Sequence, residues 1–197
     1  MAESPRNTGA RTGTARRRIL EAAARRFYAD GIAATGIDAI TADAGVAKMS
    51  LYNNFASKSA LVAASLEARH AEWLALYARR ARRTPDPLTR ILAVFDAYLD
   101  QAALAPEPGY RGSGLLNAAA ELPFGDPGRE LVRRHLAEVD GILAAGLREL
   151  TDRAHAERTA QHLSYVLNGA LVRSGLEADR RRLRDARALA VDLLTAL

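Results

Sequence analysis

Apolar residues recur three or four positions apart along most of the 197-residue chain, which is the spacing of one face of an α-helix. Ile19, Ala23 and Phe27 show this spacing in the first such segment, which begins at Thr14 and ends at Gly31. No segment shows the alternation of apolar and polar residues that is typical of a half-buried strand. The sequence therefore predicts an all-α protein of about nine or ten helices.

Glycine, proline and capping residues divide this pattern into separate helices. Thr35 has the position of an N-cap with Asp38 three residues later, so a short helix is expected to begin there and to end before Gly45. Another short helix follows up to Phe55, and Ser57 offers the N-cap of a long helix. The long helix and those after it are expected at 58–83, 88–104, 115–122, 129–152, 154–175 and 184–197.

The composition excludes several classes of protein. The chain has no cysteine, so it has no disulfide framework, no thiolate metal site and no cysteine nucleophile. No apolar run approaches the roughly 20 residues that a membrane-spanning helix needs, and we find no secretory signal. The four histidines lack the spacing of a metal site, and no catalytic pair is recognisable. We therefore expect a cytoplasmic protein that is not an enzyme and that holds no metal or cofactor.

The excess positive charge lies mostly in the first third of the chain. The net charge is +5, and residues 1–62 hold nine basic groups against five acidic ones. Only two of the 28 basic residues are lysines, and both, Lys48 and Lys58, lie in this third. Residues 1–13 are polar and have no helical periodicity, so we expect a disordered basic tail there.

Residues 35–55 have the form of a helix-turn-helix. Gly45 at the turn can adopt the left-handed conformation that a tight angle requires. In the second helix, Leu51 and Phe55 lie four residues apart and are expected to hold the helix against the core. The residues at its start then project into solvent, as those of a helix that reads DNA bases do: Lys48, Met49 and Ser50.

This part of the chain resembles the DNA-binding domain of the tetracycline-repressor (TetR) family of bacterial transcription regulators. The matching segments, in which the family's spacing is intact, are 18–23, 27–31, 35–40, 44–48 and 51–61. The resemblance implies a DNA-binding domain over 14–62 and a ligand-sensing and dimerisation domain over 63–197. It also implies a regulator, most commonly a repressor, that binds a pseudo-palindromic double-stranded DNA operator as a homodimer and is released by a small molecule. The alternative is a helical small-molecule-binding or interaction protein without operator activity, which leaves residues 35–58 unexplained.

The resemblance implies DNA contacts at the positions that match. Thr35 and Lys58 would bind phosphates, and Tyr52 and Asn53 would touch the DNA backbone. The start of the second short helix would enter the major groove through Ala47, Lys48, Met49 and Ser50. Three residues differ from those usual in the family, namely Ala47, Met49 and Asn53, and these differences bear on the operator sequence. Read alone, Tyr52 is equally a half-buried aromatic residue, and the lysines are ordinary solvated charges.

The ligand pocket of such a regulator is expected in the larger domain. Its candidate walls are apolar and aromatic residues, which are otherwise plain core: Trp73, Tyr77, Phe95, Tyr98, Leu99, Tyr110, Leu116 and Phe124. Polar residues that could orient a ligand are Asn117, Glu121, His135 and His162. A bound ligand would shift the helix at 58–83 like a lever.

A homodimer follows from the geometry of two recognition helices that read half-sites about one DNA turn apart. The helices at 129–152 and 154–175 are expected to form a four-helix bundle with those of the partner. The candidate interface residues are Gly141, Ala145, Leu163, Val166, Gly169, Ala170 and Ser174. The alternative is that these residues pack within one subunit.

Overall fold

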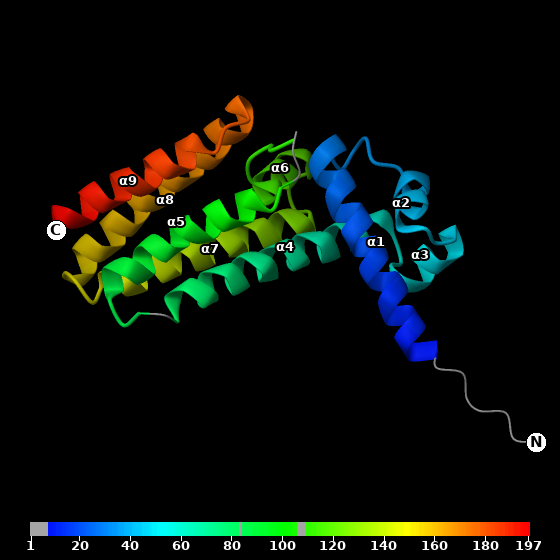
Figure 1. Ribbon diagram of the computed structural model, residues 1–197, viewed down its shortest axis with the longest axis horizontal. Coiled ribbons are helices and arrows are strands. Elements are labelled where there is room, and N and C mark those ends of the chain that lie inside the picture. The colour runs from blue at the N-terminus through cyan, green and yellow to red at the C-terminus, as the bar shows by residue number, and fades with distance from the viewer. Residues whose placement is uncertain (1–7, 83, 106–108) are drawn as a thin grey trace, which may run out of the picture.

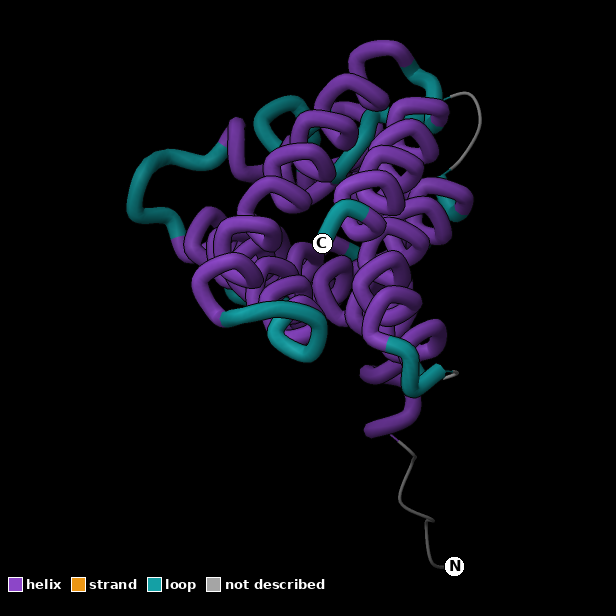
Figure 2. The backbone as a smooth tube through the Cα atoms, turned by 90° about the vertical axis from the view of Figure 1, so that its left-hand side faces the viewer, coloured by secondary structure: helices purple, strands orange, loops and turns teal. Residues whose placement is uncertain are grey.

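The computed structural model describes residues 8–82, 84–105 and 109–197. Over these ranges the chain forms nine helices joined by short loops, with no strand, which confirms the all-α prediction (Figure 2). The helices are α1 (Thr8–Asp30), α2 (Ile37–Ala44), α3 (Lys48–Asn54), α4 (Lys58–Ala81), α5 (Pro87–Ala103), α6 (Gly114–Glu121), α7 (Pro127–Leu147), α8 (Arg153–Glu177) and α9 (Arg181–Thr195).

The first three helices form a head at one end of the molecule, and the longer helices form a bundle at the other (Figure 1). α4 begins beside the head and runs along the bundle, where it packs against α5 and α7. α7 lies in the middle, since it contacts α4, α5, α6 and α8, while α8 and α9 pack together on the outer side. The short α6 lies between the two parts and contacts α1, α4 and α7.

Three apolar clusters hold these parts together. The core of the head contains Ile19, Ala22, Ala23, Ile40, Ala44, Leu51, Phe55 and Leu61. A junction cluster connects the head to the bundle through Ile32, Val62, Leu66, Leu115, Ala118, Leu131 and Val132. The largest cluster fills the bundle and includes Trp73, Phe95, Leu143, Leu147, Leu163 and Leu167. Because burial of apolar surface is the main driving force of folding, the junction cluster makes the head and the bundle one packed unit.

α1 is longer than the sequence pattern predicts. It begins at Thr8, so residues 8–13, which we assigned to a disordered tail, are helical, and residues 1–7 lie outside the described ranges. Two glycines and two threonines are among these six residues, so helix propensity does not account for the extension.

α7 ends earlier than predicted, at Leu147 instead of 152. Residues 148–150 form a turn, and the carboxylate of Asp152 then accepts a hydrogen bond from His155 N at 3.0 Å to cap α8. A local cap of this kind satisfies one of the free N–H groups at a helix start, so the chain begins a new helix at Arg153.

The predicted capping box at the start of α2 is wrong. The N-cap is Gly36, which has no side chain to accept a hydrogen bond. The Thr35 hydroxyl instead donates to Gly31 O at 2.6 Å, and the residue is buried. The expected cap at Ser57 is confirmed, because its hydroxyl accepts from Ala60 N at 3.1 Å and starts α4.

Gly45 sets the angle between α2 and α3. It has a left-handed conformation, with φ +58, and its N–H bonds back to Ala42 O. Its carbonyl accepts a hydrogen bond from the Arg18 guanidinium of α1 at 3.2 Å. A Cβ at this position would lie 2.5 Å from Arg18 Nη2, the end of a flexible side chain that would have to shift. The backbone angle is therefore the main reason for glycine here.

We expect Gly45→Ala to lower the free energy of unfolding by more than about 1 kcal/mol, because alanine is strained at this φ and displaces Arg18. Gly13→Ala is the matched control, since Gly13 lies in a helix with no atom near the added Cβ, and it should cause no loss. Urea unfolding followed by circular dichroism measures both. Equal effects of the two substitutions would contradict this account of the turn.

Candidate functional site

The start of α3 forms the exposed tip of the head. Met49 is 70% exposed and Tyr52 is 44% exposed, while Leu51 on the opposite side is fully buried in the core of the head. Lys48 and Asn53 are also exposed, and Ser50 is half-buried. The predicted division of this helix into a buried side and a projecting side is therefore confirmed.

Lys48 is paired within the head. Its Nζ lies 2.8 Å from Asp38 Oδ1 of α2, and this hydrogen bond raises the pKa of the lysine. Both side chains are largely exposed, so the pair contributes little to stability and is easily exchanged. A phosphate group could therefore replace the carboxylate of Asp38 as the partner of Lys48.

Lys58 is the first residue of α4, and it makes no hydrogen bond or ion pair with any described residue. The helix N-terminus adds a partial positive charge to that of the ammonium group, which favours a bound anion. Thr35 does not have the exposed hydroxyl that a phosphate contact needs, because the residue is buried and its hydroxyl donates to Gly31 O. Ala47 is the N-cap residue of α3 and makes no side-chain cap.

Three arginines of α1 hold the helix-turn-helix in place, which sequence reasoning missed. Arg26 donates to both carboxylate oxygens of Asp43, at 2.7 and 2.9 Å, and thereby lowers the pKa of that carboxyl group. The guanidinium of Arg16 lies over the ring of Phe55, at 5.1 Å from its centre. Together with the hydrogen bond from Arg18 to Gly45 O, these contacts connect α1 to the helix-turn-helix at three points. Much of the positive charge on α1 is thus structural.

Several of the predicted pocket residues pack together in the core of the bundle. Trp73, Tyr98 and His135 are at most 3% exposed. The ring centres of Tyr98 and His135 lie 5.1 and 5.3 Å from that of Trp73. Tyr98 Oη lies 2.8 Å from His135 Nε2, and His135 Nδ1 lies 3.0 Å from His70 Nδ1. Tyr98 also lines a second, much smaller pocket of about 10 Å³, together with Tyr110 and Arg69. These rings pack as core in the structure, and their role in ligand binding stays a prediction.

The other pocket candidates are scattered. The Glu121 carboxylate accepts a hydrogen bond from Ala33 N at 2.9 Å, and the Asn117 amide donates one to Arg111 O at 2.8 Å. Both side chains therefore have structural roles. Phe124 is 96% exposed, and His162 is exposed on α8. The remaining candidates belong to the bundle core or pack against it. Phe95 and Tyr110 are buried, and Tyr77, Leu99 and Leu116 are half-buried.

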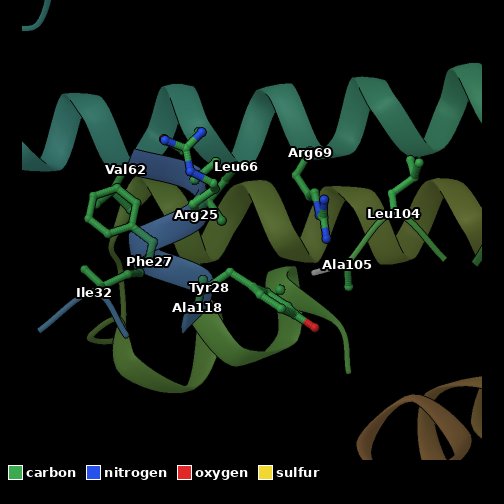
Figure 3. Close-up of a pocket in the computed structure, with 13 residues that line it drawn as sticks. Arg25, Phe27, Tyr28, Ile32, Val62, Leu66, Arg69, Leu104, Ala105 and Ala118 are labelled. Carbon is green, nitrogen blue, oxygen red and sulfur yellow. The ribbon is translucent and has the colours of Figure 1, made fainter. Parts of the chain in front are cut away.

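A cavity of about 170 Å³ lies instead where α1, α4 and α6 meet, next to the end of α5 (Figure 3). It is lined by Ala24, Arg25, Phe27, Tyr28, Ile32, Val62, Ser65, Leu66, Arg69, Leu104, Ala105, Gly114 and Ala118. None of the predicted pocket residues is among them. The apolar wall residues on α1, α4 and α6 have the spacing of ordinary helix core, so no sequence signal marks the gap between these helices.

The predicted interface residues fall into two groups. Leu163 and Ser174 are fully buried within the protomer and Ala170 is 9% exposed, so these three cannot meet a partner. The reason is that α8 turns this side toward α7 and α9. The other four are exposed or half-buried: Gly141, Ala145, Val166 and Gly169.

None of the described helices has the length and apolar character needed to cross a membrane. Among the described residues, no group of three or more histidine, aspartate or glutamate side chains lies close enough together to hold a metal ion.

A helical bundle that carries a helix-turn-helix with an exposed second helix defines the class of DNA-binding transcriptional regulators. A family model for bacterial regulatory proteins of the tetR family matches residues 19–65. A transcriptional regulator from Streptomyces avermitilis is 31% identical, with 89% of this chain and 97% of that chain covered and a TM-score of 0.71. The chain belongs to the TetR family of DNA-binding transcriptional regulators.

Other solved structures agree with this assignment. A TetR-family regulator from Streptomyces coelicolor is 28% identical, with 93% of this chain and 96% of that chain covered and a TM-score of 0.85. A TetR regulator from Chloroflexus aurantiacus, at 23% identity, shares the fold with a TM-score of 0.81 over 94% of this chain and 96% of that chain. Among curated protein sequences, none matches this chain.

The buried His135 gives the fold a pH dependence. Burial and the neighbouring His70 lower the pKa of His135 from 6.5 to about 4, so the folded protein keeps this imidazole neutral. The unfolded chain binds a proton at higher pH, so the stability contribution is complete above pH 6.5 and is lost as the pH falls toward 4. We expect the free energy of unfolding to drop by about 2 kcal/mol more between pH 7 and pH 5 than it does in His135→Gln.

Urea unfolding at the two pH values measures this difference, and His155→Gln is the control because His155 lies at the surface start of α8. An identical pH dependence in wild type and His135→Gln would contradict the lowered pKa.

Proposed function

We propose that this protein represses transcription by binding a pseudo-palindromic operator as a homodimer, and that a small molecule releases it. The observation that carries the proposal is the exposed start of α3 on a head whose turn is held by contacts from α1. A rigid, exposed helix start of this kind fits the major groove of DNA, where its first residues reach base edges. The protein would act in the bacterial cytoplasm.

In this proposal Lys48, Met49 and Ser50 read the bases, with Ala47 at the N-terminus of the helix beside them. The backbone contacts come from Tyr52, Asn53 and Lys58. Thr35 is left out because its buried hydroxyl is engaged by Gly31. Phosphate contacts fix the position of a protein on DNA, whereas contacts with base edges determine which sequence it prefers.

We expect Lys58→Ala to weaken binding to operator and random DNA by about the same factor, since Lys58 would contact a phosphate. Lys48→Ala should weaken operator binding more than random binding, by up to about tenfold, since Lys48 would also reach a base. Fluorescence anisotropy with labelled duplexes measures both. Arg134→Ala on α7 is the charge-matched control, because Arg134 is exposed in the bundle. Equal losses on both DNAs in the two lysine variants would refute this division of roles.

The outer face of α8 favours a dimer interface formed by α8 and α9, whereas the sequence predicts one formed by α7 and α8. Tyr165 is 65% exposed, Val172 is 53% exposed and Leu176 is 82% exposed, and their spacing places them on one side of the helix. Gly169 lies on the same side, where the lack of a side chain allows close approach of a second helix. Leu189 of α9 is 45% exposed. An exposed apolar surface of this kind favours α8 and α9, instead of α7 and α8, as the dimer interface.

We expect Leu176→Asp to weaken dimerisation by at least about tenfold, since the dimer would then bury an unpaired carboxylate. Leu88→Asp is the control, because Leu88 is also an exposed leucine but lies at the start of α5. Sedimentation velocity over a range of concentrations measures the dimer population. A Leu176→Asp protein that stays as dimeric as the control would exclude this face.

α4 supports a lever mechanism for release. It begins at Lys58 next to the proposed DNA contacts, and it continues without a break along the bundle to Ala81. A ligand can change DNA affinity only through a difference in its affinity for the two states, and a difference of about 1–3 kcal/mol corresponds to roughly 5- to 150-fold coupling.

A further inference from the structure

We propose that the cavity between α1, α4 and α6 binds a small carboxylate with an apolar body of about one ring, and that this ligand controls the contact between head and bundle. The inference deepens the ligand-responsive function proposed above and rests on it for its regulatory part. The cavity is not formed by the core of the bundle. Its walls come from both parts of the molecule, with α4 above it, α6 below it and α1 beside it in Figure 3.

The size and walls of the cavity limit the ligand. At about 170 Å³ it resembles in volume the apolar cavity of about 150 Å³ that accepts benzene in other proteins. Phe27, Ile32, Val62, Leu66 and Ala118 give it an apolar lining. A ring or a short branched chain therefore fits, and a large multi-ring molecule does not.

Two arginines give the cavity a positive side. Among the residues that the structure describes, its lining includes Arg25 and Arg69 and no aspartate or glutamate. Arg25 is exposed and makes no hydrogen bond or ion pair with the described residues. Arg69 donates through Nη1 to Glu72 at 3.0 Å and lies over the ring of Tyr28, which leaves further N–H donors of its guanidinium for a ligand. A carboxylate is the group that a guanidinium binds best. A ligand carboxylate would share Arg69 with Glu72, and Arg25 is near the charge of Asp43 without an ion pair to it.

Tyr28 connects the cavity to the contact between head and bundle. Its ring lines the cavity, and its hydroxyl accepts from Arg111 N at 2.6 Å and donates to Gly112 O at 3.2 Å. Arg111 in turn donates through Nη1 to the carbonyl of Tyr28 at 3.0 Å, close to the end of α1. A ligand that displaces the Tyr28 ring therefore has to move these hydrogen bonds.

The same loop also touches the outer helix of the bundle. Gly112 lies so close to α8 that a Cβ there would be 2.6 Å from Leu171 O and 3.1 Å from Gly175 Cα. The loop that Tyr28 holds is thus packed between α1 of the head and α8, which carries the proposed dimer face. Movement at the cavity can reach both the head and the dimer contact by direct packing, without passing through the core of the bundle.

The binding test uses the full chain without DNA. Benzoate, cyclohexanecarboxylate and isovalerate are titrated into ¹⁵N-labelled protein, and chemical shifts are followed by NMR. Benzamide and benzylammonium are the uncharged and cationic controls for benzoate. We expect at least one carboxylate to bind, with shifts centred on the cavity, and benzoate to bind at least about tenfold more tightly than either of its controls.

Two pairs of variants locate the site. Ala118→Leu fills the cavity and should abolish binding, whereas Ala120→Leu places the same side chain on the exposed side of α6 and should not. Arg25→Gln should remove most of the preference for benzoate over benzamide, and Arg134→Gln should retain it. Because Arg25 is exposed, its substitution tests the site even where Ala118→Leu perturbs folding. Absence of binding by all three carboxylates, or binding that neither Ala118→Leu nor Arg25→Gln alters, would overturn the assignment.

DNA binding is measured separately, by anisotropy with and without a saturating amount of the carboxylate that binds. We expect operator affinity to change by at least about fivefold in wild type and to remain unchanged in Ala118→Leu. Carboxylate binding with unchanged operator affinity would refute the regulatory part and leave the binding site standing. Carboxylate binding by a protein that binds no DNA would refute the repressor function proposed above and leave the site intact.

Discussion

The packing of α1 against both halves of the molecule is the constraint on which the rest of the structure depends. Its middle turns place Ile19 and Ala23 in the core of the head. Its last turns place Phe27 and Tyr28 against the junction and the bundle. No other helix of the head contacts both α4 and α6 so extensively. The position of the recognition helix relative to the bundle is therefore set largely by one helix.

The basic side chains of the head fall into two groups. Some make contacts that hold the head together, and others are free to bind an anion. Planar guanidinium groups hold α1 against the turn, through the bidentate pair of Arg26 with Asp43 and the contact of Arg18 with Gly45 O. The two lysines differ, since one has only an exposed partner and the other has none among the described residues. The basic head is thus rigid because of its arginines, and it is able to bind an anion because of its lysines and Arg25.

The parts of the structure that depend on local periodicity could be predicted from the sequence. The four-residue spacing of Leu51 and Phe55 correctly indicated the buried side of α3. The capping box at Thr35 failed because α2 begins one residue later, with Gly36 as its N-cap, and the Thr35 hydroxyl turns inward to donate to Gly31 O. The cavity could not be predicted either. It is a gap between α1, α4 and α6, and its walls, such as Phe27 and Val62, are ordinary core residues of helices far apart in the sequence.

The pair of Lys48 and Asp38 has a consequence for how DNA binding responds to ions. A lysine without a partner that meets a phosphate releases a counterion from the DNA, and affinity then falls with salt according to the number of phosphates neutralised. Here the carboxylate of Asp38 already neutralises the ammonium group at 2.8 Å. If Lys48 meets the DNA as proposed, it has to leave this carboxylate, which then adds a negative charge beside the DNA. In such a complex, a count of basic residues at the interface would overstate the net positive charge that meets the DNA.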